Sequence, residues 1–275
     1  MAMTINTNAA SLNAQRNTAA SGASLATTMA RLSSGLRVNS AKDDAAGLAI
    51  ADRMSTQVRG MNVAIRNAGD GISMAQIAEG GLSGIGDMLQ RMRELAVQAS
   101  NATNKNEDIT KLNKEFVELG AEVTRMVDAT QFNGQKILKS SASLVFQVGA
   151  GGSAASFDEI TIAGIDLTSA FSAVTSLGSA NSTARDMLAI LDTALGTIND
   201  HRATLGATQS RFENTISYLR TAVENQSAAR GRIMDADFAA ESANLSRSQI
   251  LQQAGTAMIA QANQLPQNVM RLLQG

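Results

Sequence analysis

The longest regular pattern of hydrophobic positions lies between Leu188 and Ile233. Hydrophobic residues recur there in alternating steps of three and four, and Arg202, Gln209 and Arg230 occupy in-register positions. This is the heptad spacing of helices that pack along a seam. The pattern predicts one helix of about 69 Å, at 1.5 Å per residue. Other helices, of this chain or of a copy, must cover its apolar side. The apolar members of this seam are Leu188, Leu191, Leu195, Ile198, Leu205, Phe212, Ile216, Leu219, Val223 and Ile233.

Two further stretches keep a helical period, one from Ile50 to about residue 100 and one from Ile109 to Met126. The polar segment 101–108 separates them as a loop. Six glycines between residues 69 and 86 interrupt the first stretch, and each costs up to about 1 kcal/mol relative to Ala in a helix. We therefore expect the backbone of this helix to approach a neighbour closely there. Three seams of similar period predict a mainly α fold, built as a long antiparallel helical bundle or coiled-coil rod.

The segment 130–183 differs in character from the rest of the chain. It contains an Asn-Gly turn in TQFNG and the β-rich runs SLVFQV and EITIAGIDL, with Gly and Ser between them. This composition predicts a small β-hairpin region, which we expect to cap the helices.

The two ends of the chain resemble each other. Residues 1–42 contain no Asp or Glu, and no charged residue lies between Arg247 and Arg271. Each end carries a narrow apolar helical stripe that buries too little surface to order alone. We predict that the ends pack on each other and on neighbouring copies, and that residues 1–45 with 231–275 form a terminal helical-pair domain beside a helical rod domain, 46–230. The stripe residues are Leu25, Met29, Leu32, Leu251, Met258, Leu265, Val269 and Leu272.

Composition excludes several classes of function. The 275 residues have a net charge of −1, which gives no field for nucleic acid or an anionic membrane surface. No run of 18 apolar residues could span a bilayer, and the first residues lack the basic flank and apolar core of a signal peptide. With no Cys there is neither a disulfide framework nor a thiolate site. An aromatic content of 3% suits helical bundles better than aromatic-lined pockets.

Three candidate chemical features each have a simpler explanation. Residues 149–154 match G-x-G-x-x-A after a strand, but the next strand follows too soon for the helix that a dinucleotide site requires. His201 is the only histidine, and zinc needs three or four ligands. Asp43 and Asp44 are adjacent in a polar loop, where they favour the start of the next helix. We expect no enzyme activity, no metal and no cofactor.

Four motifs are similar to those of a known family. They are RLSSGLRVNSAKDDAAG at 31–47, LQRMRELAVQ at 89–98, TQFNG at 130–134 and SRSQILQQAGTAMIAQANQLPQNV at 246–269. Together they closely resemble bacterial flagellin, over residues 1–139 and 185–275. Only a short segment stands where larger flagellins insert outer domains, so the chain resembles a minimal form.

The resemblance implies that the two ends pair as an inner-tube domain and that the middle helices form an outer rod domain. Copies would polymerise helically into the flagellar filament for motility, outside the bacterial cell. It also implies that the flagellar export apparatus secretes the chain unfolded and that assembly occurs at the filament tip. The implied partners are the chain itself, the flagellar export chaperone, and the cap and hook-junction proteins.

The family also implies recognition by the host Toll-like receptor that detects flagellin. The matching positions are Gln90, Arg91, Glu94 and Leu95, with Glu115 as the acid on the following helix. A different class of function stays open, an interaction module such as a needle, translocator or filament-junction protein of the same export system. Such proteins share helical tails but lack the full combination of motifs found here.

Overall fold

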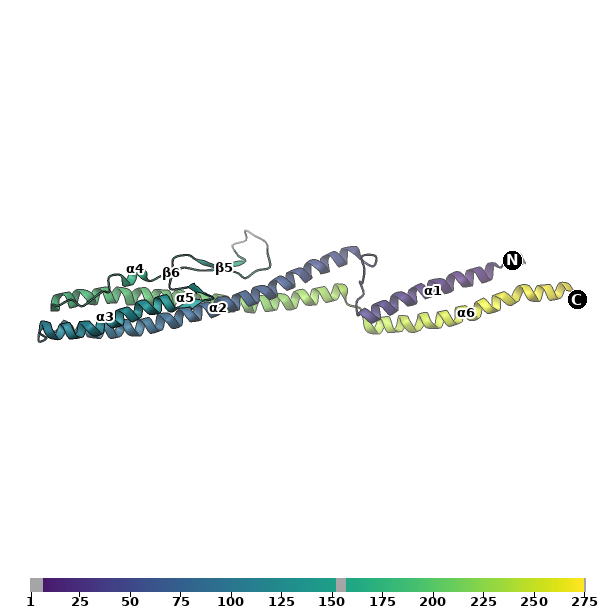
Figure 1. The fold of residues 1–275 in the computed structure, drawn as a ribbon. Coiled ribbons are helices and arrows are strands. Elements are labelled where there is room, and N and C mark those ends of the chain that lie inside the picture. The colour runs from purple at the N-terminus through teal and green to yellow at the C-terminus, as the bar shows by residue number, and fades with distance from the viewer. Residues whose placement is uncertain (1–6, 152–156, 275) are drawn as a thin grey trace. The chain divides into compact units, whose positions relative to one another are not determined.

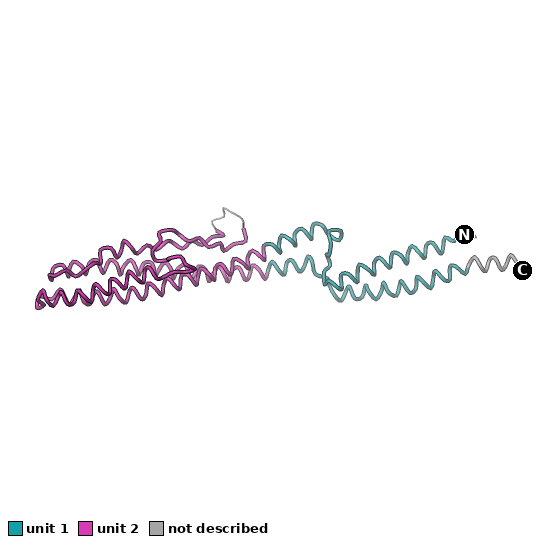
Figure 2. The backbone as a smooth tube through the Cα atoms, viewed as in Figure 1, with its two compact units in different colours: residues 1–56, 225–275 teal, residues 57–224 magenta. Residues whose placement is uncertain are grey.

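The computed structural model describes residues 7–151 and 157–274, those from 265 onward by their backbone only. The chain divides into two compact units, residues 1–56 with 225–275 (unit 1) and residues 57–224 (unit 2), coloured separately in Figure 2. The chain passes between units inside its two longest helices, α2 (Ala45–Ala99) and α5 (Asn181–Met234). The domain limits expected at residues 45 and 230 stay a prediction.

Unit 1 is built around α1 (Ala9–Ser34) and α6 (Phe238–Gln274), which lie side by side (Figure 1). The helix α1 begins at an Asn8 cap, whose Oδ1 accepts a hydrogen bond from the backbone N of Ser11 at 3.1 Å. It ends at Gly35, whose φ of 70° is the left-handed conformation that closes many helices. Both ends of α1 are therefore defined by local chemistry.

Short connections after α1 and after α5 are tied together within unit 1. The backbone N of Arg37 donates to the carbonyl of Met234 at 2.6 Å, and Leu36 forms an antiparallel bridge with Asp235. The two acids expected to favour the next helix have different roles. Asp44 does so, since its Oδ1 accepts from the backbone N of Gly47 at 2.8 Å. Asp43 instead closes the preceding loop.

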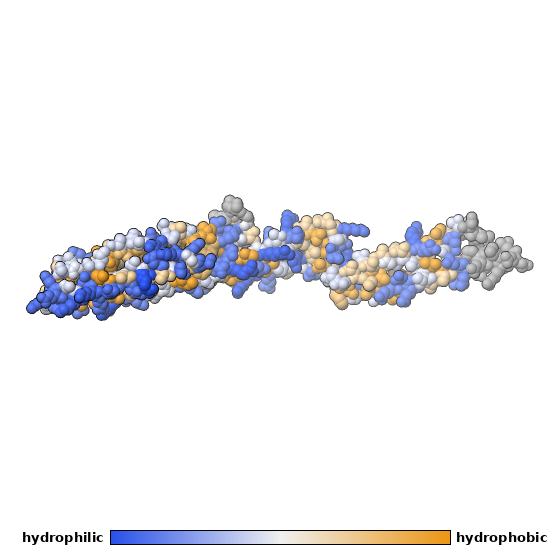
Figure 3. Space-filling view, in the orientation of Figure 1, coloured by the Kyte–Doolittle hydropathy of each residue, from blue (hydrophilic) through white to orange (hydrophobic). Residues whose placement is uncertain are grey.

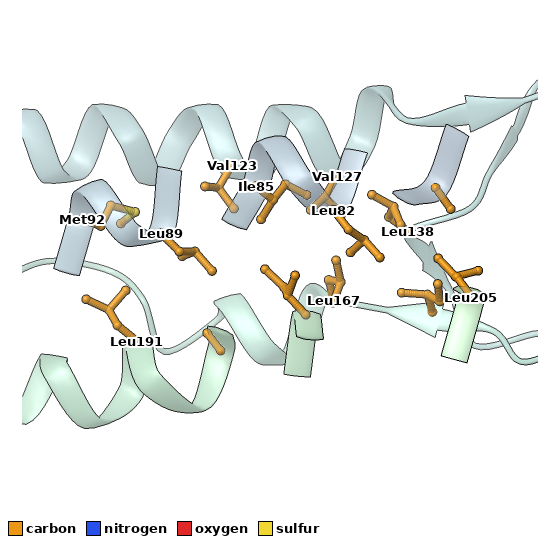
Figure 4. Close-up of a cluster of buried hydrophobic side chains, with 14 of the residues drawn as sticks. Leu82, Ile85, Leu89, Met92, Val123, Val127, Leu138, Leu167, Leu191 and Leu205 are labelled. Atoms are coloured by element: carbon orange, nitrogen blue, oxygen red, sulfur yellow. The ribbon is translucent and has the colours of Figure 1, made fainter. Parts of the chain in front are cut away.

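Unit 2 contains most of α2 and α5 together with α3 (Asn106–Ala129). Their apolar faces meet in one continuous core, and Figure 4 shows side chains from all three helices pointing into it. The contributors include Leu82, Ile85, Leu89 and Met92 of α2, Val123 and Val127 of α3, and Leu191 and Leu205 of α5. The mainly α fold predicted from the three seams is confirmed.

The seam on α5 alternates between buried and half-buried residues, as a heptad helix covered on one side should. Its polar member Gln209 is half-buried, and its Nε2 donates to Oε2 of Glu79 on α2 at 3.1 Å. Of the expected seam positions, Arg230 is exposed, and Ile233 near the end of the helix is half-buried again. The fully buried members are Leu191, Ile198, Leu205, Phe212 and Leu219.

The close approach expected at the glycines of α2 occurs at some of them and not at others. A Cβ at Gly71, Gly81 or Gly84 would lie within 3 Å of a side chain on a neighbouring element. At Gly69, Gly80 and Gly86 nothing lies within 4 Å. The backbone of α2 therefore approaches a neighbour closely at three of these six glycines, where it meets side chains such as Phe212 and Met126, and not at the other three.

Within residues 7–151 and 157–274, the strands form three two-stranded antiparallel sheets. The first is a tight hairpin of β1 (Gln131–Phe132) and β2 (Gln135–Lys136), with φ of 49° at Asn133 and 79° at Gly134. Positive φ at both central residues is the type I′ geometry that Asn-Gly favours. The other pairs are β4 (Leu144–Gln147) with β5 (Glu159–Ile162) and β3 (Lys139–Ser140) with β6 (Ile165–Asp166), followed by the short helix α4 (Thr168–Phe171).

The strands lie along the flank of α2 and α5 rather than capping the helices (Figure 1). The Nδ2 of Asn67 on α2 donates to the carbonyl of Gln147 at 2.9 Å, and the rings of Phe146 and Phe212 meet edge to face at 5.6 Å. The cap was the wrong prediction, because apolar residues on the strands complete the core from the side. β4 and β5 pair antiparallel, whereas dinucleotide-binding folds pair parallel strands. Residues 152–156 of the candidate G-x-G-x-x-A segment lie outside the described part.

Candidate assembly and recognition surfaces

The contact between α1 and α6 is made mainly by small and polar side chains. The Nδ2 of Asn8 donates to the carbonyl of Ala262 at 2.8 Å, and the hydroxyl of Ser11 donates to Oδ1 of Asn263 at 2.8 Å. Thr28 and Ser248 are also buried. Because Asn8 and Ser11 meet the far part of α6 while Arg31 meets Glu241 near its start, the two helices run antiparallel.

Several large apolar side chains of this helix pair face outward instead. Met29, Leu251 and Met258 are 55%, 51% and 62% exposed, although each belongs to a stripe expected to be covered. Leu25 and Leu32 are half-buried, and the side chains of Leu265, Val269 and Leu272 lie outside the described part. Figure 3 shows apolar patches along this pair. We call Leu12, Met29, Ile250, Leu251 and Met258 the outward apolar residues.

A second surface surrounds Arg91 on α2. Its Nε and Nη2 both donate to Oε1 of Glu115 on α3, at 3.0 and 2.9 Å, and its Nη1 donates to Oε2 of Glu94 at 3.0 Å. The hydrogen bond to Glu115, and then that to Glu94, raises the pKa of the exposed Arg91 guanidinium above its ordinary value. The structure thus brings Arg91, Glu94 and Glu115 together from two helices.

The other residues expected at this surface differ in exposure. Gln90 is exposed beside Arg91, whereas Leu95 is only 1% exposed and belongs to the core. Leu95 therefore lies beneath the surface and supports the helical turn that carries Arg91. Sequence reasoning missed the neighbouring pair of Arg93 Nε and Asp192 Oδ1, at 2.6 Å. Nothing local signals it, because the two residues are far apart in the chain.

The structure offers no metal site over the residues that it describes, where His, Cys, Asp and Glu side chains form no group of three able to hold an ion. His201 is half-buried on α5. None of the helices, over the same residues, combines the length and hydropathy that a bilayer span requires.

Comparison with known families identifies these helices. The model of the bacterial flagellin N-terminal helical region matches residues 5–143, and that of the bacterial flagellin C-terminal helical region matches residues 188–273. The chain belongs to the bacterial flagellin family. It is a structural subunit of the flagellar filament that self-assembles into a polymer, and it is not an enzyme.

Individual flagellins match nearly the whole chain. A flagellin of Halalkalibacterium halodurans is 44% identical over 98% of this chain and 100% of its own length. The flagellar filament 33 kDa core protein of Treponema phagedenis is 40% identical over 98% of this chain and all of its own. The crystal structure of Bacillus cereus flagellin superposes with a TM-score of 0.51 at 34% identity, covering 60% of this chain and 94% of that one.

Proposed function

We propose that copies of this flagellin contact one another through the outward apolar residues of the α1–α6 pair. The supporting observation is the inversion of burial in this pair, where Ser11, Thr28 and Ser248 are buried while Met29 and Met258 are more than half exposed. Apolar side chains left in water by one chain are stabilised when a second chain covers them.

The polymer follows from the kind of contact. A surface that meets a different surface on the next copy produces an open helix when the rotation does not close a ring. Burial of an apolar side chain contributes about 1.5–3 kcal/mol. The outward apolar residues make the contact dependent on a neighbouring copy, because the helix pair by itself leaves each of them more than half exposed.

This contact is tested with full-length Met258→Gln and Leu251→Gln variants, since Gln retains helix propensity. The critical concentration for polymerisation should rise at least about tenfold for each, as expected for loss of about 1.4 kcal/mol per contact. Gln252→Ala, an exposed polar change in the same turn of α6, is the matched control. Polymerisation of both Gln variants at the parent's critical concentration would refute the proposal.

Before assembly, the exposed residues of α6 bind the flagellar export chaperone, and the export apparatus secretes the chain unfolded to the filament tip. The cap and hook-junction proteins then meet the same end of the chain. An apolar stripe that must stay covered before polymerisation supports this order. Deletion of residues 246–275 should abolish both chaperone binding, measured by calorimetry, and motility. Retained motility in the deletion strain would contradict it.

The surface around Arg91 is recognised by the host Toll-like receptor that detects flagellin. Its support is an exposed guanidinium held in a fixed position by Glu115 and Glu94, with Gln90 alongside and Leu95 beneath. A preformed arrangement loses little entropy on binding. Arg91→Ala should reduce signalling in a receptor reporter assay at least about tenfold, as for loss of a contact of 1.4 kcal/mol. Arg125→Ala, an exposed arginine on α3 paired with Glu122, is the control. Equal signalling by Arg91→Ala and the parent would reject this assignment.

A further inference from the structure

We propose that a groove beside Arg31, between α1 and α6, receives a carboxylate side chain from a second copy of this chain during assembly. The groove has a volume of about 460 Å³ and lies within unit 1. Its walls are mainly polar and come from both helices. They include Ser24, Thr28 and Arg31 of α1, and Glu241, Arg247 and Ser248 of α6.

The guanidinium of Arg31 is incompletely used within the chain. Its Nε is buried and has no hydrogen-bond partner. Its Nη1 lies 3.9 Å from Oε1 of Glu241, which is close enough for an ion pair but too long for a hydrogen bond. Buried donors in folded proteins nearly always have an acceptor. The unpaired Nε shows that the single chain leaves the guanidinium unsatisfied. Because Nε itself is closed to solvent, an acceptor from a second chain would meet the terminal nitrogens of this side chain, which is 32% exposed.

A second acid near Arg31 is already engaged elsewhere. The charge of Arg31 reaches Asp43, but Oδ2 of Asp43 accepts hydrogen bonds from the backbone N of Asn39 at 3.1 Å and of Ser40 at 2.9 Å. These bonds hold the carboxylate in its own loop. Neither Asp43 nor Glu241 therefore satisfies the guanidinium.

Charge favours a carboxylate as the occupant. Residues 9–34 and 238–274 contain four arginines and one acid, Glu241, which leaves an excess of three positive charges. A planar guanidinium fork matches the two oxygens of a carboxylate, and hydroxyl groups such as those of Ser24 and Thr28 can donate to the same oxygens. The polar lining disfavours an apolar side chain there.

The position of the groove favours a second copy as the source. The carboxylate would come from a part of that copy outside α1 and α6, because these helices contain only Glu241 as an acid. Leu251 lines the groove and is also one of the outward apolar residues. A neighbouring chain that covers Leu251 therefore reaches the groove as well. In this respect the inference rests on the proposed apolar contact between copies. It adds an ionic contact, which would make the apolar contact specific.

Three full-length variants test the role of Arg31 through the critical concentration for polymerisation. Arg31→Gln should raise the critical concentration about tenfold, the size expected for one charge-assisted contact. Arg31→Lys keeps the charge without the planar fork, so its critical concentration should lie between those of the parent and Arg31→Gln. Glu241→Gln removes the internal partner but leaves the guanidinium available, so it should polymerise like the parent or at lower concentration. An equal rise for Arg31→Gln and Glu241→Gln would show that Arg31 serves only the internal pair, and an unchanged Arg31→Gln would also overturn the proposal.

Salt dependence separates this contact from the apolar one. Added NaCl should raise the critical concentration of the parent and of Met258→Gln more steeply than that of Arg31→Gln, because an exposed ionic contact is screened. Equal salt slopes for the parent and Arg31→Gln would overturn the ionic contact and leave the apolar contact standing. If Arg31→Gln lost polymerisation while Met258→Gln polymerised like the parent, the apolar contact would be overturned and the ionic contact would stand.

Discussion

The ring of Phe212 on α5 lies directly against Gly71 on α2, so close that a Cβ at position 71 would be 2.6 Å from Cζ of the ring. The ring of Phe146 on β4 also meets Phe212, edge to face. A glycine that weakens its own helix thus allows two helices and a strand to meet around one aromatic ring.

Gly71→Ala should lower the free energy of unfolding, because the ring is buried and has no free side to move toward. Overpacking of this kind costs about 1–3 kcal/mol, partly offset by up to about 1 kcal/mol of helix propensity. Gly69→Ala and Gly80→Ala are matched controls in the same helix with nothing within 4 Å, and they should stabilise the chain. Urea unfolding followed by circular dichroism measures all three, and a Gly71→Ala variant as stable as the controls would contradict the packing.

Asp128 at the end of α3 should make stability depend on acidity. Hydrogen bonds from Lys136 and then Lys139 lower its pKa to about 2. Because the folded pKa lies below the ordinary value of 3.8, the stabilisation is complete above about pH 4 and is lost as the pH falls through about 2. Asp128→Asn should therefore have a lower melting temperature than the parent at pH 7. The difference in melting temperature between the two proteins should decrease toward pH 2. Asp87→Asn, on the exposed side of α2, is the control, and a gap that stays constant with pH would refute this role.

Asn181 at the start of α5 should stabilise the end of α2. Its Nδ2 donates to the carbonyl of Ala99, the last residue of α2, at 3.0 Å, and to that of Asn101 in the following loop at 2.6 Å. The end of a helix leaves carbonyls such as that of Ala99 without a partner inside the helix. Asn181→Ala should cost about 1–2 kcal/mol, as expected for two hydrogen bonds that are partly replaced by water. Ser182→Ala, at the next and exposed position, should have little effect. Hydrogen exchange at the last turn of α2 should increase in the first variant alone, and unchanged exchange there would count against the cap.

The antiparallel pairing of α1 and α6 should depend on Gly255, where an added Cβ would collide with the hydroxyl of Thr18. Gly255→Ala should make both ends of the isolated chain more sensitive to protease, whereas Gly22→Ala, which faces open space, should not. The double variant Gly255→Ala with Thr18→Ala removes the collision. It should restore the parent's resistance, and failure of this rescue would place the defect elsewhere.

Much of this protein is determined by sequence alone. The three- and four-residue steps identified α2, α3 and α5, because an apolar stripe at that period can be buried only by a helix. The Asn-Gly pair at 133–134 determined a hairpin, since both residues tolerate positive φ. The motifs at the two ends and in α2 identified the flagellin family. None of these inferences required knowledge of which residue meets which.

Tertiary structure decided which side of each stripe is covered. In the terminal helices it buried Ser11, Thr28 and Ser248 and left Met29 and Met258 outside, because a hydropathy pattern gives the direction of an apolar side but not its partner. For the same reason it placed Leu95 under the Arg91 surface and not on it, and laid the strands along the helices and not over their end. Local period follows from the geometry of one helix, whereas burial depends on contacts between residues far apart in the chain.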